Sequence, residues 1–158
     1  MRALSVLLLL TALLTGSAVA REARSPCDVV SKPALRAALG GEPVAPDPAT
    51  IGEETAPSCI WTVRGSNVRL KIEIWSGDEL AVVGAKSARA YFVMRRREAL
   101  NDHVVRFSVS GSAAFRTRFE PAGGEIGVLK DRRFLAFTFE RIPLVRARRF
   151  AKAVVRRL

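Results

Sequence analysis

Few side chains in this sequence could perform acid–base or nucleophilic chemistry. The chain holds one histidine, His103, which directly follows Asp102. Neighbouring side chains on an expected strand point to opposite faces, so this pair cannot form a His–Asp relay by itself. A hydrolase that used His103 would need a distant serine or carboxylate to complete its site. The sequence therefore favours a non-catalytic protein, and a small hydrolase that uses His103 remains the alternative.

Metal and nucleotide sites have little support in the sequence. Two cysteines, Cys27 and Cys59, and one histidine fall short of the three or four ligands that zinc sites use. The chain contains neither a Gly-x-x-x-x-Gly-Lys-Ser/Thr stretch nor a Gly-x-Gly-x-x-Gly stretch, which are the usual phosphate cradles. We expect no cofactor and no metal ion.

Residues 1–20 have the three parts of a secretory signal peptide. Arg2 precedes a leucine-rich run over residues 7–14, and Ala18-Val19-Ala20 places small residues where a signal peptidase reads them. The apolar run is shorter than the ~20 residues that span a bilayer, which argues against a membrane anchor. We expect cleavage to leave one exported domain, residues 21–158, without a transmembrane segment. That domain would be secreted or held in the periplasm or cell envelope.

The cysteine count predicts a disulfide bond. In an exported chain, an even number of cysteines indicates pairing, and Cys27 and Cys59 are the only two. Closing this loop would stabilise the fold by roughly 3 to 4 kcal/mol on the chain-entropy model. The alternative is a pair of free, buried thiols.

The charge balance is strongly basic. Lysine and arginine number 26 against 15 acidic residues, giving a formal net charge of +11. Such an excess attracts anionic partners over long range, although a compositional bias towards arginine would produce the same excess. We expect the partner to be an envelope protein, an anionic polymer or a lipid surface. Nucleic acid is not an expected partner outside the cytoplasm.

The closing helix, which Pro143 opens, is the main candidate for an anion-binding surface. At 100° per residue its apolar side chains share one face and its cations share the other, which predicts docking on a sheet with the charges in water. A basic protein active at membrane surfaces is the alternative. The apolar stripe consists of Leu144, Ala147, Phe150, Ala151, Val154, Val155 and Leu158. The candidate anion-binding residues are Arg146, Arg148, Arg149, Lys152, Arg156 and Arg157.

Hydrophobic periodicity predicts the elements that must position this helix. Apolar residues at 68, 70, 72 and 74 alternate with polar ones, which indicates a strand with one face in the core. Ser31 and Gly40 mark the ends of a short helix, and Asp78 is expected to cap a helix that runs to about Leu100. The remaining expected elements are a loop over 41–57, strands over 59–63, 105–109 and 114–119, a turn at Gly123-Gly124, and a hairpin of 125–129 with 133–140. Together they predict an α+β fold, with a single antiparallel sheet covered by helices.

The two cysteine segments also resemble a known group of proteins. Cys27 precedes the short helix that ends at Gly40, and Cys59 stands two residues before Trp61. This pattern resembles small exported proteins and lipoproteins of actinobacterial cell envelopes, which form a domain of unknown function. The resemblance implies an α/β sandwich and supplies no catalytic residues. The chain departs from that group because it lacks a lipid-modified cysteine and has Gly111-Ser112 where the group has Gly-Asp.

Overall fold

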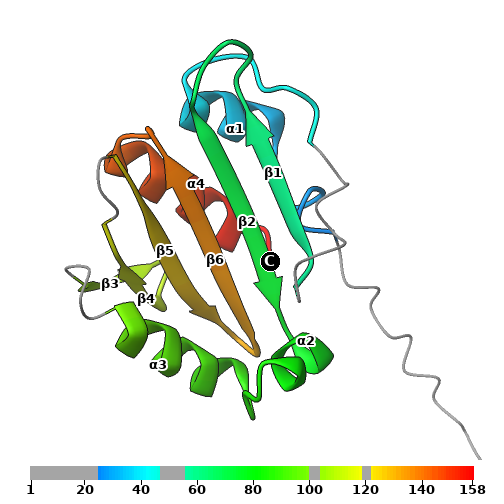
Figure 1. The fold of residues 1–158 in the computed structure, drawn as a ribbon, viewed down its shortest axis with the longest axis vertical. Helices are drawn as coiled ribbons and strands as arrows, with labels where there is room; N and C mark the ends of the chain where they lie inside the picture. Colours follow the sequence, from blue (N-terminus) through cyan, green and yellow to red (C-terminus); the bar gives the residue numbers. More distant parts are fainter. Residues whose placement is uncertain (1–24, 47–55, 100–103, 119–121) are drawn as a thin grey trace, which may run out of the picture.

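The computed structural model describes residues 25–46, 56–99, 104–118 and 122–158, so the expected signal peptide lies outside the described residues. The described residues form one sheet of six strands and four helices (Figure 1). The strands are β1 (Ser58–Thr62), β2 (Arg69–Trp75), β3 (Val105–Val109), β4 (Ser112–Arg116), β5 (Gly123–Lys130) and β6 (Arg133–Glu140). The helices are α1 (Lys32–Leu39), α2 (Gly77–Val82), α3 (Ala88–Glu98) and α4 (Leu144–Val155).

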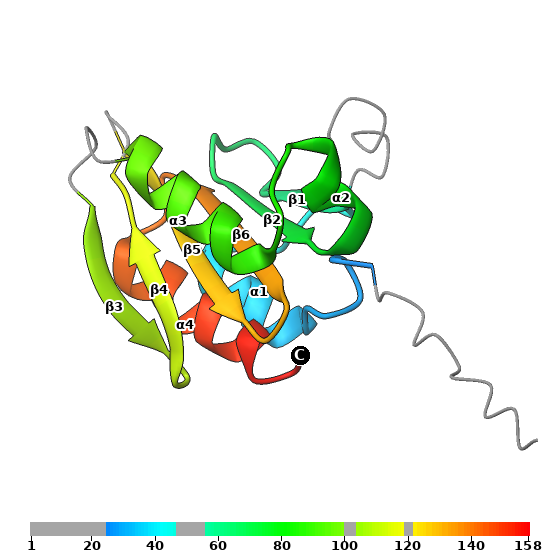
Figure 2. The same cartoon turned by 90° about the horizontal axis from the view of Figure 1, so that it is seen from below.

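Every pair of neighbouring strands is antiparallel, and the strand order is β1-β2-β6-β5-β4-β3. Helices α1 and α4 lie on one face of the sheet, while α3 crosses the other face and α2 lies at its end (Figures 1 and 2). The predicted α+β class, with a single antiparallel sheet covered by helices, is therefore confirmed. No helix in the described ranges is both long and apolar enough to cross a membrane.

The alternating strand sequence builds the core beneath α1 and α4. Leu70 and Ile72 of β2 are fully buried there, beside Phe137 and Phe139 of the neighbouring β6. Trp61 belongs to the same cluster, so its ring is a core side chain. The period of two predicted this face because successive strand residues point to opposite sides.

The predicted disulfide between Cys27 and Cys59 is present and joins the turn before α1 to β1. Helix α1 has the predicted ends. The Ser31 hydroxyl accepts the N–H of Ala34 at 3.4 Å, and Gly40 closes the helix in a left-handed conformation with φ 75°. The disulfide thus ties the segment before α1 to β1, while α1 and α4 pack in the same core cluster.

The prediction of one helix from Asp78 to about Leu100 is wrong, because the structure has two helices, α2 and α3, in this region. The Glu79 side chain accepts the N–H of Ser76, so Ser76 rather than Asp78 marks the start of α2. Gly84, with φ 70°, turns the chain after α2, and Ser87 caps α3. Glycine adopts this left-handed conformation without the steric cost of a Cβ atom, which explains why the helix stops here.

The predicted turn at Gly123-Gly124 is also wrong, because both glycines lie in β5. A Cβ atom on Gly124 would lie within 3 Å of both the Thr117 carbonyl oxygen and the Phe139 ring. Glycine is therefore needed here for close packing rather than for a turn. The hairpin predicted around residues 130–132 is confirmed, with Lys130 paired to Arg133.

Helix α4 docks on the sheet as predicted. Its apolar stripe contacts the core, and the Phe150 ring meets the Phe137 ring edge to face at a centroid distance of 6.2 Å. The predicted stripe residues Leu144, at the start of α4, and Leu158, beyond its end at Val155, are half-buried. Docking leaves α4 to present mainly its polar side to solvent. The fully buried stripe residues are Ala147, Phe150, Ala151, Val154 and Val155.

Candidate anion-binding groove

A groove of about 600 Å³ lies between β3 and the outer side of α4, and is here called the β3–α4 groove. Its apolar part comes from Phe107 and Val109 of β3 and from Leu144 and Val145 of α4. Its polar part comes from the two serines and four cations that complete the lining. The lining residues are Phe107, Ser108, Val109, Ser110, Leu144, Val145, Arg148, Arg149, Lys152 and Arg156.

Four cations and no acid line this groove, as far as the described residues are concerned. The guanidinium of Arg148 lies 4.8 Å from the centroid of the Phe107 ring, a cation–π contact that fixes one cation over the groove floor. In the part of the chain that the structure describes, none of the four cations takes part in an ion pair. Their charge is therefore available to a partner.

The helical repeat explains why three of these cations form a row. Arg148, Lys152 and Arg156 follow one another at intervals of four residues, so they lie on one side of α4. With a rise of 1.5 Å per residue, their Cα atoms are spaced by about 6 Å along the helix. The groove therefore presents a linear array of positive charges rather than a single cationic point.

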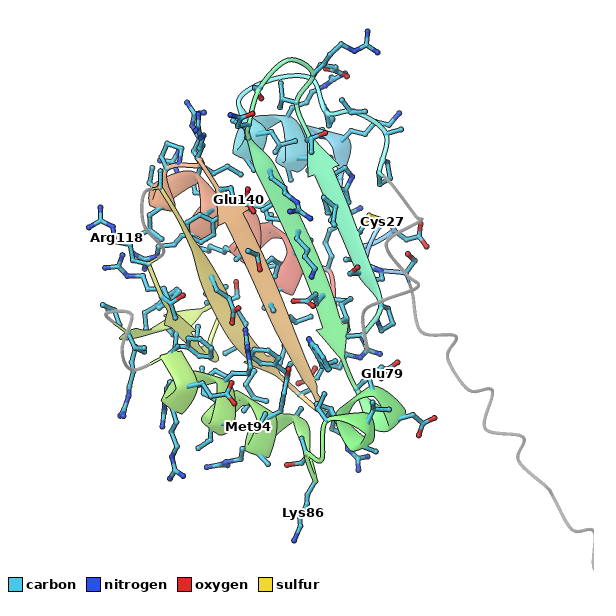
Figure 3. All side chains as sticks on the ribbon, in the orientation of Figure 1. Cys27, Glu79, Lys86, Met94, Arg118 and Glu140 are labelled. Carbon is cyan, nitrogen blue, oxygen red and sulfur yellow. A yellow bond between two sulfur atoms is a disulfide. The ribbon has the colours of Figure 1, made fainter. Side chains whose placement is uncertain are left out.

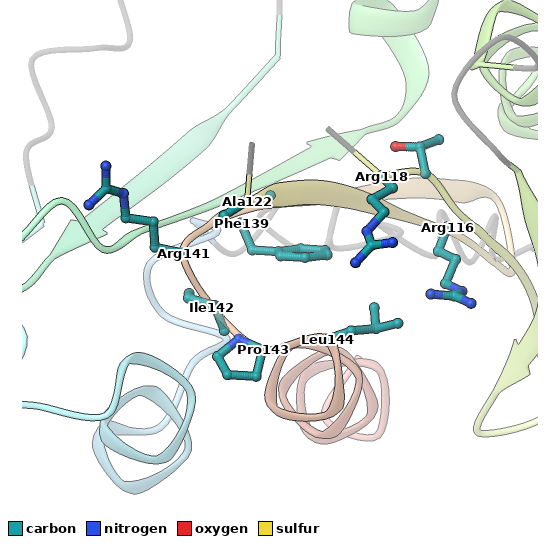
Figure 4. Close-up of a pocket in the computed structure, with 10 residues that line it drawn as sticks. Arg116, Arg118, Ala122, Phe139, Arg141, Ile142, Pro143 and Leu144 are labelled. Carbon is teal, nitrogen blue, oxygen red and sulfur yellow. The ribbon is translucent and has the colours of Figure 1, made fainter. Parts of the chain in front are cut away.

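A second cleft, of about 560 Å³, lies beside the start of α4 and shares Leu144 with the β3–α4 groove. Arg116 and Arg118 point towards the hollow between Phe139 and Leu144, whereas Arg141 extends away from it (Figure 4). None of the described residues that line this cleft is acidic. The two hollows thus extend the basic surface from α4 to the end of β4.

Sequence reasoning did not single out Arg116 and Arg118. Arg116 pairs with Ile126 of β5, which belongs to the core beneath α4, so the side chains of residues 116 and 118 point to the α4 face. The alternation of Ala114, Arg116 and Arg118 was the available signal. It identifies one face of the strand, but only the tertiary structure places that face beside α4.

The six predicted cations lie on α4 and on the two residues after it, and all are exposed. Arg149 lines both the β3–α4 groove and, with Arg146, a small hollow against α1. Four line the β3–α4 groove, and Arg146 and Arg157 lie towards α1. Arg146 packs beside Gly40 at the end of α1, and Arg157 donates to the Val29 carbonyl oxygen at 3.5 Å. The structure thereby narrows the candidate site to Arg148, Arg149, Lys152 and Arg156.

The catalytic alternative depends on His103, which lies outside the described residues together with Asp102. Among the described residues, no group of three or more histidines, cysteines and carboxylates is placed to hold a metal ion.

The opposite face of the sheet contains a buried carboxylate that the sequence did not indicate. Glu125 of β5 is only 5% exposed, and its carboxylate accepts a hydrogen bond from Arg95 of α3 at 2.7 Å. Burial raises the pKa of Glu125 and outweighs the attraction of Arg95, which lowers it. Glu140 of β6 also lies on this face (Figure 3), and an apolar cluster that includes Trp75 and Phe134 packs there against α3. Ionisation of Glu125 in this buried position therefore lowers the free energy of unfolding.

Because the pKa of Glu125 is raised in the folded protein, the free energy of unfolding should depend on pH. The unfolded Glu125 loses its proton near the ordinary pKa of a glutamate side chain, whereas the folded protein retains it to a higher pH. The contribution of Glu125 to the free energy of unfolding is therefore full below the unfolded pKa and is lost as the pH rises through the folded pKa.

Denaturant unfolding of the parent protein and Glu125→Gln at several pH values tests this term. We expect the stability of the parent relative to the variant to fall as the pH is raised from about 4 towards neutrality. Glutamine has a similar shape and does not titrate, so the difference isolates the carboxyl group. A difference that stayed constant or grew with pH would contradict the assignment.

Comparisons with known proteins add no identification. A scan of protein-family models, a search of curated proteins and a search of solved structures each found no match to the chain.

Proposed function

We propose that this chain is an exported, non-catalytic domain of the cell envelope that binds an anionic partner through the β3–α4 groove. The main support for the proposal is that four cations and no acidic residue line this groove. The disulfide supports export, because such bonds persist mainly in oxidising compartments outside the cytoplasm. The partner is an envelope protein, an anionic polymer or a lipid surface, which share negative charge as the recognised feature.

The docking of α4 on the sheet determines which of its surfaces can contact a partner. The apolar stripe of α4 is buried on the sheet, so the helix offers its cationic side and the groove floor to a ligand. Binding is then mainly electrostatic, with Phe107 and Val145 adding a small apolar contact. Exposed charges separated by water are screened by salt, which gives the proposal a clear experimental signature.

Retention on immobilised dextran sulfate tests the proposal. Protein recovered after export of the full chain should bind at low salt and be released by several hundred millimolar salt, where the screening length shrinks to roughly 3 to 10 Å. Replacing Arg148, Arg149, Lys152 and Arg156 with glutamine should weaken binding by about tenfold or more, because these side chains supply the array of charge.

The matched control removes four positive charges elsewhere. Arg64, Lys86, Arg89 and Arg132 are all exposed and lie outside the β3–α4 groove. Their replacement with glutamine lowers the net charge equally, so it separates the groove from general attraction. Equal losses in the two quadruple variants, both folded by circular dichroism, would show that net charge alone drives retention and would overturn the proposal.

A further inference from the structure

The β3–α4 groove lies against an open edge of the sheet. Strand β3 is the last strand in the order, and within the described residues only β4 pairs with it. At the opposite edge, a segment within the disulfide loop approaches β1, with Pro43 bridging Val63 and the Val44 N–H donating to the Thr62 carbonyl. The edge at β3 has no such cover in the described ranges, and Val105 is 43% exposed there.

The hairpin register indicates which backbone groups face outward from β3. Ser110 and Gly111 form a two-residue turn with positive φ at both positions, closed by the pair Val109 and Ser112. The residues that close such a turn are hydrogen-bonded to each other, and the bonding alternates along an antiparallel pair. Ser108 and Arg106 therefore direct their N–H and C=O groups away from β4, where an added strand could pair with them.

An added strand would lie beside the row of cations on α4. Antiparallel alternation makes β3 run opposite to β6, and α4 runs back along the sheet from the end of β6, so β3 and α4 run in similar directions. Alternate residues of a strand are about 6.7 Å apart on one face. The row of Arg148, Lys152 and Arg156 repeats at about 6 Å, so acidic side chains at alternate positions would each meet a cation.

We propose that the β3–α4 groove binds an acidic, extended peptide segment of a partner protein, which adds to β3 as a seventh strand and directs alternate carboxylates towards α4. This inference rests on the proposed anion-binding function and specifies its partner. Backbone pairing with β3 provides the affinity common to strand addition, and the cations select acidic side chains. A second copy of this chain fits less well, because it would bring two sets of groove cations together.

The test compares a peptide with its peptoid analogue. A short peptide that alternates glutamate and threonine is titrated against the exported protein at low salt, alongside a peptoid carrying the same side chains. The peptoid keeps the charge but has no backbone N–H groups, so it cannot pair as a strand. We expect it to bind at least about tenfold more weakly than the peptide. Equal binding would overturn strand addition while leaving anion binding intact.

A variant on the protein side tests the same contact. Ser108→Pro removes an outward N–H while leaving the bonds between β3 and β4, because proline is tolerated at such edge positions. It should lower peptide binding to about the level of the peptoid. If this variant does not fold, the comparison of peptide and peptoid on the parent protein still decides the question.

Dextran sulfate serves as the reference ligand that separates the two proposals. If the parent binds neither dextran sulfate nor the peptide, the proposed function itself fails. If the parent binds dextran sulfate but not the peptide, only the acidic strand is refuted. Sedimentation measures the oligomeric state of the free protein. A dimer in the parent that becomes a monomer in Ser108→Pro would show that the β3 edge binds a second copy of this chain. That result would overturn the peptide proposal.

Discussion

Replacing Phe137 with alanine is expected to lower the free energy of unfolding by about 3 to 5 kcal/mol, the usual range for a buried phenylalanine. Phe137 is 1% exposed at the centre of the sheet, and its ring contacts Phe150 of α4. Truncation would leave a cavity beneath the helix that carries the groove cations. Since small domains are stable by only about 5 to 15 kcal/mol, this loss is a large fraction of the total.

Denaturant unfolding measures this loss, with Val82→Ala as the matched control. Val82 is 70% exposed on α2, so its truncation should change stability by no more than about 0.5 kcal/mol. A loss below about 1 kcal/mol for Phe137→Ala would mean that α4 does not pack on the sheet at this point. The positions of the groove cations would then need to be revised.

Removing the disulfide is expected to cost roughly 3 to 4 kcal/mol, because the bond restricts the unfolded chain over a sequence separation of 32 residues. The double variant Cys27→Ala/Cys59→Ala should therefore unfold at a clearly lower denaturant concentration than the parent. Cys59 lies in the core beside Trp61, so alanine avoids placing a new polar group there.

Thiol titration of the denatured, unreduced protein provides the control for the disulfide. The purified, unreduced protein should show no reactive thiol, because the described structure pairs both cysteines of the chain. Two reactive thiols, together with unchanged stability of the double variant, would contradict a structural role for the bond.

Much of the fold could be predicted from the sequence because the signals are local. The alternation of Leu70, Ile72 and Ile74 defined a strand and its buried face. Ser31 and Gly40 defined the ends of α1, and the spacing of apolar residues on α4 predicted its docked stripe. In each case the residues involved are neighbours along the chain, so a periodic pattern was sufficient.

The remaining features depend on contacts between distant residues. Gly124 appeared to be a turn residue, but its close packing against Thr117 and Phe139 is set by tertiary structure. The Arg95–Glu125 pair joins residues 30 positions apart, and nothing in the local sequence marks it. Gly84 was the available signal for the break between α2 and α3, since its conformation favours glycine.

The candidate site was predicted in part for the same reason. The helical pattern identified the cations of α4, but only the sheet order shows which of them face β3. The contact of Phe107 with Arg148, and the cleft that Arg116 and Arg118 share with Leu144, bring together residues that are distant along the chain. Sequence periodicity identifies the faces of elements and does not specify which faces meet.

An NMR titration of the protein with dextran sulfate at low salt most directly tests the claim that the β3–α4 groove is the anion-binding surface. The largest changes in amide chemical shift should fall on residues 107–110 and 144–156, and high salt should reverse them. Lys86, Arg89 and Arg132, which lie around a separate cleft, should change little. Dominant changes around those three residues, with α4 unaffected, would contradict the assignment of the groove.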